Sequence, residues 1–340
     1  MRTLTEQDLN RALLARQLLL QRARLPIPRA LERIGGIQAQ YAPSMYIGLW
    51  SRLEGFERDA LTRALDRRAV VQATLMRATI HLVSKRDFWP FAVAIREPRR
   101  RWWERTHPDR PRDLVAAGKR LRGFLADGPR RRAEIEAFLG RERASGVGAY
   151  LDLVRAPPSG TWEQRRADLY AAAEDWVGPV EVDVEAAREL IIRRYLAAFG
   201  PATRGDLADW AGIPVGELTQ PLERLKLRRF EDGEGKELLD LPRAPLPAAD
   251  TPAPPRFLPV WDATLLVHCR RTGILPEEYR PLVFNVKTPN SVNTFLIDGQ
   301  VAGTWRYDGG NMRIRPFDSV ARSARRDLED EAKRLAAFHS

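Results

Sequence analysis

Apolar residues recur at helical spacing over most of the first 240 positions and are interrupted by glycine and proline. Residues 186–199 (AARELIIRRYLAAF) carry apolar side chains three and four positions apart, as an amphipathic helix does. Gly200 and Pro201 end this helix, and Thr203 is placed to cap a short second helix with Asp206 at its third position. The pattern predicts two helices joined by a tight turn.

The following residues predict a third helix and a β-hairpin. Gly212 closes the short helix, and Pro214 suits the first turn of a helix over 214–227, which Pro221 should bend or restart. Residues 228–241 (RRFEDGEGKELLDL) contain two short strand-like runs around a Gly-rich turn. This order of elements is that of a winged helix-turn-helix unit.

An internal repeat indicates that this unit occurs more than once. Residues 128–140 (GPRRRAEIEAFLG) align without gaps with residues 200–212 (GPATRGDLADWAG), and their apolar positions recur at helical spacing. The first copy follows a predicted helix at 113–126 and precedes less distinct strands within 147–154 and 160–173. A second winged-helix unit is therefore predicted.

The N-terminus allows a further copy of the same order. Helices are predicted at 5–20, 28–36 and 56–68, and residues 70–83 (VVQATLMRATIHLV) alternate as paired strands do. We therefore predict three tandem units in a mainly α chain with small β wings.

The last part of the chain is richer in strand signals. A Pro/Ala linker at 241–256 precedes strand-like runs that are separated by Thr-Pro-Asn-Ser, Asp-Gly and Asp-Gly-Gly turns. These runs predict a small sheet or an open barrel, and residues 318–339 predict a charged closing helix. The predicted parts are winged-helix units at 1–95, 96–184 and 185–242, and a C-terminal β-rich segment with its helix at 257–340.

Charge adds a prediction about the partner. The chain has 340 residues, of which 44% are hydrophobic, and a net charge of +11, which favours an anionic partner such as nucleic acid or a membrane surface. Residues 96–143 hold fifteen Lys or Arg and eight Asp or Glu, whereas residues 168–189 hold seven acids and one arginine. One region is thus basic and another acidic.

Cysteine and hydropathy narrow the class further. Cys269 is the single cysteine, which excludes an internal disulfide and a Cys-based zinc or iron-sulfur site. The four histidines have no metal-ligand spacing, and we expect neither a metal nor a cofactor. No apolar run approaches a membrane span and the N-terminus lacks a signal peptide, so a cytoplasmic, nucleoid-associated monomer is expected.

The arginine tract at 96–112 (REPRRRWWERTHPDRPR) is open to two interpretations. Its cations could follow phosphates while Trp102 and Trp103 stack on bases, or the tract could be a solvated helix whose tryptophans belong to a core. The repeat contains a second basic run. The candidate DNA-binding arginines are Arg99, Arg100, Arg101, Arg130, Arg131 and Arg132.

Two amides stand out near the end of the predicted N-terminal helices. Residues 34–43 read IGGIQAQYAP, so Gln38 and Gln40 flank one alanine between a Gly-Gly pair and a Tyr-Ala-Pro break. If the backbone is extended, both side chains point to one face, whereas a regular helix would separate them. The glycine and proline flanks favour irregular backbone. Taken by spacing, such a pair is usually an ordinary structural or surface amide.

Four stretches together resemble the AlkZ-like bacterial DNA glycosylases, in order and over nearly the whole chain. They are residues 35–56, 77–83 (RATIHLV), 259–280 and 295–306. The resemblance implies three winged-helix units in a C-shaped chain with a concave, positively charged duplex-binding surface. It also implies that Gln38 and Gln40 form the catalytic Gln-apolar-Gln motif.

The resemblance also bears on the substrate and on a hairpin. A sister branch has Asp at the second motif position, so Gln40 implies the branch that unhooks bulky N-alkyl adducts and interstrand crosslinks. A cleft hairpin matters in the family, and residues 283–296 are the candidate. Its predicted DNA-binding residues are Lys287, Asn290, Ser291 and Asn293.

Several other residues are expected to be structural. His81 lies in a strand-like run, where a hydrogen-bonded structural histidine is favoured over a catalytic one. Trp261 and Asp262 could cap a turn, and Arg271 could pair with a carboxylate.

The chemistry of alkylated purines explains how two amides could suffice. Alkylation at guanine N7 or adenine N3 makes the base cationic, so it leaves as a neutral molecule without strong acid catalysis. Amide dipoles can then position water and stabilise an oxocarbenium-like transition state. We hypothesise a monofunctional, metal-free DNA glycosylase that acts on alkylated purines in duplex DNA. The alternatives are a non-catalytic winged-helix DNA-binding protein or transcription regulator, and a protein-interaction scaffold.

Overall fold

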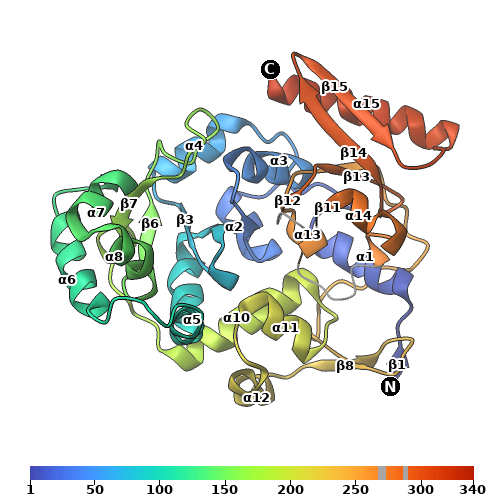
Figure 1. The fold of residues 1–340 in the computed structure, drawn as a ribbon. Coiled ribbons are helices and arrows are strands. Elements are labelled where there is room, and N and C mark those ends of the chain that lie inside the picture. The colour runs from blue at the N-terminus through green and yellow to red at the C-terminus, as the bar shows by residue number, and fades with distance from the viewer. Residues whose placement is uncertain (267–272, 286–289) are drawn as a thin grey trace.

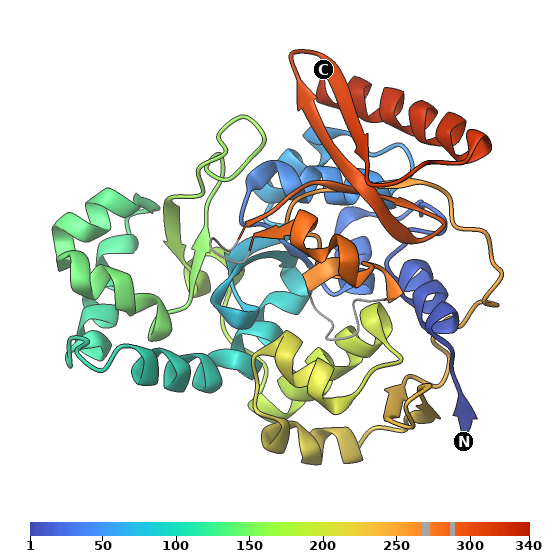
Figure 2. The same ribbon diagram turned by 45° about the vertical axis from the view of Figure 1, so that its right-hand side comes forward.

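The computed structural model describes residues 1–266, 273–285 and 290–340. Helices dominate the chain and small sheets join them, as the sequence predicts (Figure 1). The lobe of α6–α8 and the C-terminal sheet lie on opposite sides of the N-terminal helices (Figures 1 and 2).

The N-terminal part contains the predicted helices and hairpin, and one further helix. Pro43 was expected to break the chain, yet α3 begins at Ala42, because proline is tolerated in a first helical turn where no N–H donor is needed. The elements are β1 (Arg2–Thr3), α1 (Glu6–Arg16), α2 (Ile27–Ile34), β2 (Ile37–Gln38), α3 (Ala42–Arg52), α4 (Arg58–Asp66), β3 (Val70–Thr74), the 3₁₀ turn η1 (Met76–Ala78) and β4 (Ile80–Ser84).

The next part begins with a long helix that crosses the predicted boundary between residues 95 and 96. Helix α5 is continuous across that position. The elements are α5 (Lys85–Thr106), α6 (Leu114–Leu125), β5 (Arg130–Arg131), α7 (Arg132–Leu139), α8 (Arg141–Gly146), η2 (Val147–Ala149), β6 (Leu153–Arg155), β7 (Leu169–Ala172) and α9 (Ala173–Val177).

One sheet joins these two parts of the chain. Its strand order is β2-β4-β3-β6-β7-β5, and the antiparallel pairing of β3 with β6 places Gln72 opposite Arg155. The sequence predicted separate wings for the two parts. Pairing of β3 with β6 instead satisfies edge strands that separate two-stranded wings would leave open.

The third part follows the predicted order of helices and hairpin. Thr203 and Asp206 form the predicted capping box, with Thr203 Oγ1 accepting from the Asp206 N–H at 3.0 Å. The helix predicted over 214–227 is shorter in the structure: α12 ends at Glu223, two residues after Pro221, and does not restart there. The elements are α10 (Val184–Phe199), α11 (Arg204–Ala211), α12 (Val215–Glu223), β8 (Arg228–Glu231) and β9 (Glu237–Asp240).

Aromatic residues of three helices meet in the main core. Trp210 of α11 lies 5.9 Å from Phe91 of α5 and 5.2 Å from Tyr195 of α10, between ring centroids. All three side chains are almost fully buried, and such aromatic contacts add to the free energy of burying their surface. Helices α5, α10 and α11 are thereby held as one unit.

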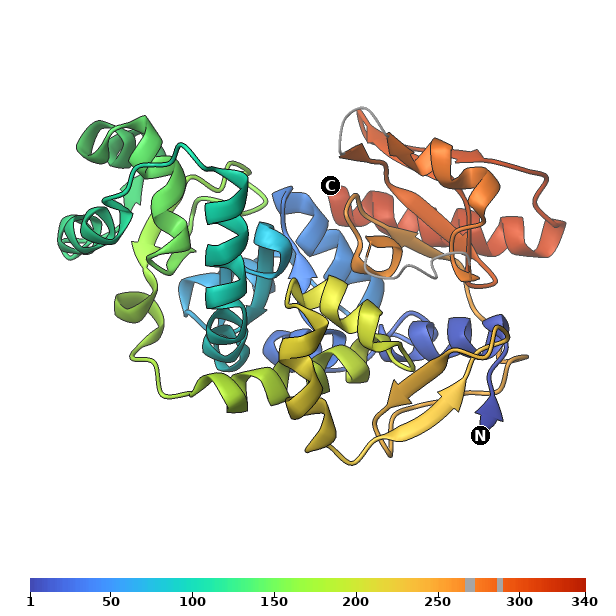
Figure 3. The same cartoon turned by 60° about the horizontal axis from the view of Figure 1, so that its bottom comes forward.

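The C-terminal segment is an open sheet and not a barrel. Its strands have the order β10-β13-β14-β15, and α15 packs against them (Figure 3). The elements are β10 (Arg256–Leu258), α13 (Ala263–Leu266), η4 (Glu277–Tyr279), α14 (Arg280–Val283), β11 (Phe284–Asn285), β12 (Asn290–Ser291), β13 (Thr294–Ile297), β14 (Gln300–Asp308), β15 (Asn311–Pro316) and α15 (Arg322–His339).

A buried ion pair ties this segment to α3. Both guanidinium Nη atoms of Arg52 lie 2.9 Å from the carboxylate oxygens of Asp262, which also accepts from the N–H of Thr264. Asp262 therefore caps a turn, as predicted. Arg271, which was expected to pair with a carboxylate, lies outside the described residues.

Candidate active site around the glutamine pair

Two glycines turn the chain from α2 into the strand that carries the glutamine pair. Gly35 ends α2 in the left-handed region at φ 77°, and Gly36 follows at φ 83°. A Cβ atom on Gly36 would lie 3.0 Å from Cγ1 of Val83. The backbone conformation and the close approach to β4 therefore both require glycine before Ile37.

The glutamine motif begins at the edge of the six-stranded sheet, where β2 contains Ile37 and Gln38. Gln38 lies opposite His81 in β4, and the N–H of Ala39 donates to the carbonyl oxygen of Ile80 at 2.7 Å. The backbone is thus extended at Gln38 and bends at Gln40, and convergence of the two side chains stays a prediction.

Both glutamine side chains contact the same short segment, residues 77–80. Oε1 of Gln38, which is 6% exposed, accepts from Nη2 of Arg77 at 3.4 Å. Oε1 of the exposed Gln40 accepts from the N–H of Ile80 at 2.8 Å. Each amide oxygen keeps a second lone pair, and neither amide NH₂ has a hydrogen-bond partner within the described chain. These groups remain available to a ligand.

The turn that holds Gln38 is strained. Arg77 and Ala78 both adopt left-handed backbone conformations, at φ 52° and φ 56°. Such conformations cost about 1–3 kcal/mol each for residues other than glycine, and they persist only where surrounding contacts impose them. Here the N–H of Leu75 donates to the carbonyl oxygen of Thr79 at 2.9 Å, and Nη1 of Arg77 donates to that of Trp210 at 2.6 Å.

The side chain of Arg77 is exposed to solvent on one side and packed against protein atoms on the other. Its side chain reaches solvent, yet nearby protein atoms lower the pKa of its guanidinium from the usual value through burial. It has no carboxylate partner among residues 1–266, 273–285 and 290–340. A guanidinium stays protonated under these conditions, so Arg77 places an unneutralised positive charge beside Gln38.

His81 is a buried, neutral histidine. It is 3% exposed, and its Nδ1–H donates to the carbonyl oxygen of Thr79 at 3.0 Å. Burial, and secondly the charge of Arg77, lower the pKa of His81 to about 3. A hydrogen-bonded histidine in a strand is what the sequence predicts, and the 77–83 stretch acts as the support of the motif.

The predicted DNA-binding arginines of α5 are engaged within the protein. Arg99 donates to Asp152 at 2.9 Å and to the carbonyl oxygen of Thr74 at 3.0 Å. Arg100 pairs with Glu104 and lies over the ring of Tyr150, and Arg101 pairs with Glu217. DNA binding by these three arginines stays a prediction.

The predicted arginines of the repeat are engaged in the same way. Arg131 pairs with Asp168 at 3.0 Å, and Arg132 pairs with Glu136 at 2.6 Å. Arg130 lies over the ring of Phe124, with its Cζ 5.1 Å from the ring centroid. Contact of this run with DNA likewise stays a prediction.

Within the candidate hairpin at 283–296, β11 pairs antiparallel with β12, and its position in a cleft stays a prediction. Asn290 lies in β12, and Lys287 lies outside the described residues. Ser291 Oγ accepts from the N–H of Trp261 at 2.8 Å, and Asn293 Oδ1 accepts from that of Val260 at 2.9 Å. Ser291 and Asn293 thus fix the 260–261 segment, and their predicted role on DNA remains open to test.

Two cations near the motif were missed from the sequence. Arg77 opens the RATIHLV stretch but lacks any local signal of its contact with Gln38. Arg165, in the loop between β6 and β7, donates to the hydroxyl of Tyr41 at 3.0 Å. Tyr41 directly follows Gln40, so Arg165 brings a positive charge from the second part of the chain to the motif.

Neither a metal cluster nor a membrane helix is found within the described ranges. No group of three or more His, Cys, Asp or Glu residues there could hold a metal ion. Of the helices described, none is long and apolar enough to cross a membrane.

The α-rich fold of this chain is similar to that of a solved DNA glycosylase. The structure of Streptomyces sahachiroi DNA glycosylase AlkZ matches 99% of this chain and 97% of that chain, with a TM-score of 0.84 and 20% identity. The Interstrand DNA cross-link repair glycosylase of Streptomyces sahachiroi is 24% identical over 355 residues, which cover 94% of this chain and 93% of the relative. The family model described as DNA glycosylase AlkZ-like matches residues 31–338, and the chain belongs to this family.

Proposed function

We propose that this chain hydrolyses the N-glycosidic bond of alkylated purines in duplex DNA, with Gln38 and Gln40 as the catalytic residues. The observation that carries the proposal is the placement of both amides against residues 77–80, each fixed by one hydrogen bond. Two fixed amides with spare lone pairs and NH₂ groups can hold a water molecule and orient dipoles toward one point.

The proposed substrate supplies its own activation. A purine alkylated at N7 or N3 is cationic and leaves as a neutral base, so no group with a pKa near neutrality is needed to protonate it. Water adds to the sugar carbon as the bond to the base breaks, and its proton passes to solvent. Gln38 and Gln40 contribute through position and dipole, which fixed groups do without a reorganisation cost.

Arg77 has a positioning role in this proposal. Because its guanidinium donates to Oε1 of Gln38 and to the carbonyl oxygen of Trp210, it fixes the orientation of the Gln38 amide. Its contact with Gln38 explains why a strained turn is retained between β3 and β4.

The substrate class can be proposed one step further. The relative from Streptomyces sahachiroi is named for interstrand crosslink repair, and this chain has Gln at both motif positions. We therefore include bulky N-alkyl adducts and crosslinks, which a metal-free, monofunctional and monomeric enzyme would release on a concave surface formed by winged-helix units.

The test is release of base from defined duplexes. Purified protein is incubated with duplexes that carry N7-methylguanine or an N7-linked crosslink, and free base and abasic sites are measured. Replacing either glutamine (Gln38→Ala or Gln40→Ala) should lower the excision rate at least about 100-fold and change the Kd for DNA less than about 2-fold. Gln220→Ala, at an exposed glutamine of α12, is the matched control.

The outcomes separate the proposal from its main alternative. Tight duplex binding without base release from either lesion would refute the enzymatic function for these substrates and support a non-catalytic DNA-binding protein. Weak binding with little dependence on salt would instead support a protein-interaction scaffold, because phosphate contacts release counterions.

A further inference from the structure

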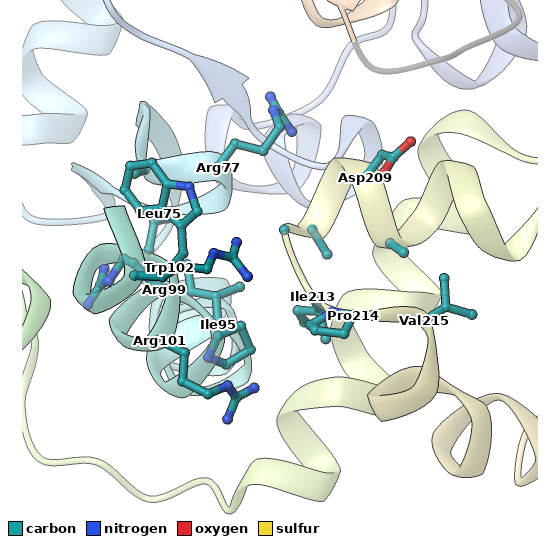
Figure 4. A pocket seen from close by; sticks show the side chains of 16 residues that line it. Leu75, Arg77, Ile95, Arg99, Arg101, Trp102, Asp209, Ile213, Pro214 and Val215 are labelled. Atoms are coloured by element: carbon teal, nitrogen blue, oxygen red, sulfur yellow. The ribbon is translucent and has the colours of Figure 1, made fainter. Parts of the chain in front are cut away.

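A groove beside Arg77 is not used by the glutamine chemistry. It runs between α5 and the α11–α12 junction and has a volume of about 530 Å³ (Figure 4). In Figure 4, Arg101 and Trp102 on the α5 side face Ile213, Pro214 and Val215 across the groove. Arg77 both lines the groove and contacts Gln38, so the groove adjoins the candidate active site.

The two adjacent tryptophans of the arginine tract have different environments. Trp103 stacks on the ring of His107 at a centroid distance of 3.5 Å, whereas Trp102 lines the groove and is 42% exposed. An exposed indole in a partly apolar groove offers a stacking face, and the apolar wall across from it excludes water.

The cations of the groove leave positive charge in excess. Neither Arg77 nor Arg105 has a carboxylate partner within the described chain, and Arg101 forms an ion pair with Glu217 of α12. Asp209 is the one acidic residue among the described residues that line the groove. The groove thus combines a stacking surface with cations that a phosphate would neutralise.

We propose that this groove is a subsite for one nucleotide of the DNA strand next to the lesion, with its base on Trp102 and its phosphate near Arg105. The proposal rests on the proposed function of the glutamine pair. The alkylated purine itself is assigned to Gln38 and Gln40, neither of which lines the groove, so the groove is left for a neighbouring nucleotide. A phosphate-bearing nucleotide is complementary in charge and has a π-face for the indole.

The subsite requires a neighbouring nucleotide to leave the base stack. Unstacking costs a few kcal/mol in intact duplex and less where pairing is already disturbed. The protein should therefore bind a duplex with one unpaired nucleotide more tightly than the fully paired duplex. In the duplex with the unpaired nucleotide, less free energy is needed to unstack the base.

The experiment uses two duplexes that differ in a single unpaired 2-aminopurine nucleotide. We expect wild-type protein to bind the bulged duplex about 10-fold more tightly and to quench its fluorescence through stacking on Trp102. Trp102→Ala should remove both effects, and Trp102→Phe, which keeps an aromatic face, should retain most of them. Phe138→Ala, at an exposed aromatic residue of α7, is the control.

A second variant addresses the phosphate. Arg105→Ala should weaken binding about 3-fold to 10-fold. It should also lower the slope of log Kd against log salt concentration by about one, which corresponds to the loss of one phosphate contact. Arg243→Ala, an exposed arginine after β9, serves as the charge-matched control.

The failure of this subsite and that of the proposed function are distinguishable. If wild-type protein releases N7-methylguanine while Trp102→Ala keeps wild-type affinity, bulge preference and quenching, the subsite is refuted and the glycosylase is not. If no base is released while the bulge preference depends on Trp102, the subsite stands and the proposed function fails. Thermal unfolding of each variant shows that losses do not reflect misfolding.

Discussion

Three arginines of the basic runs differ from two arginines near the glutamine pair in what neutralises them. Arg99, Arg131 and Arg132 each pair with a carboxylate. Arg77 and Arg165, in contrast, donate to carbonyl, amide or hydroxyl oxygens and have no carboxylate partner in the part of the chain described. The density of arginine in the sequence therefore does not identify the cations that are available to a polyanion.

The difference arises because the neutralising acids come from elsewhere in the chain. Asp152 pairs with Arg96 and Arg99 of α5, and Asp168 pairs with Arg131, in both cases across tens of residues of sequence. A buried ion pair mainly compensates the desolvation of its own charges. We therefore expect the paired arginines to affect stability and the unpaired ones to affect DNA.

The largest expected effect tests the arginines that pair with carboxylates. Asp152→Ala removes both ion pairs and leaves Arg99, whose side chain is 9% exposed, without a carboxylate. We expect the free energy of unfolding to fall by about 3 kcal/mol, because an uncompensated buried charge is costly. Urea unfolding measures the loss. If DNA affinity rises several-fold instead, Arg99 is a DNA-binding residue whose charge Asp152 restrains.

The second prediction concerns the pH dependence of stability near Arg77. His81 stays neutral in the folded chain down to a pKa of about 3, whereas an unfolded histidine becomes protonated below about 6.5. Its contribution to stability is therefore lost as the pH falls, by about 2 kcal/mol between neutrality and pH 5. In His81→Asn, whose amide can donate to Thr79 as Nδ1–H does, unfolding at pH 7 and pH 5 should show a smaller difference. An unchanged difference would contradict this assignment.

The third prediction tests Arg77 as a positioning residue. Arg77→Ala should lower the single-turnover excision rate at saturating protein about 10-fold, because the Gln38 amide loses its restraint. Arg77→Lys keeps the positive charge, but a single ammonium group cannot reach both Gln38 and the Trp210 carbonyl oxygen as the two Nη atoms of arginine do. It should therefore recover only part of the rate. Full recovery with lysine would indicate that charge alone matters.

The smallest expected effect comes from two neighbouring arginines in the loop between β6 and β7. Arg165 contacts Tyr41 and no described carboxylate, whereas Arg166 pairs with Asp168 at 3.1 Å. Arg165→Ala should weaken duplex binding about 3-fold and lower the salt slope by about one, and Arg166→Ala should do less. Equal effects of the two substitutions on titrations at several salt concentrations would argue against the distinction between paired and unpaired arginines.

Local signals in the sequence predicted much of the fold. The Thr203–Asp206 capping box and the β8–β9 hairpin rest on short-range chemistry, and both are present. Pro43 was misread, because the same residue that breaks a helix interior is tolerated in its first turn. The joint sheet could not be predicted, since pairing of β3 with β6 depends on contacts between residues far apart in the chain.

The sequence by itself determined the family and the glycine turn before the glutamine pair, because these depend on residue identity and local backbone preference. Tertiary structure alone decided which charges remain unneutralised. Arg99 and Arg77 are both arginines in basic or motif-bearing stretches, and only the packing of other elements gives Asp152 to one and Gln38 to the other. Electrostatic pairing acts through space, so its outcome is set by the fold.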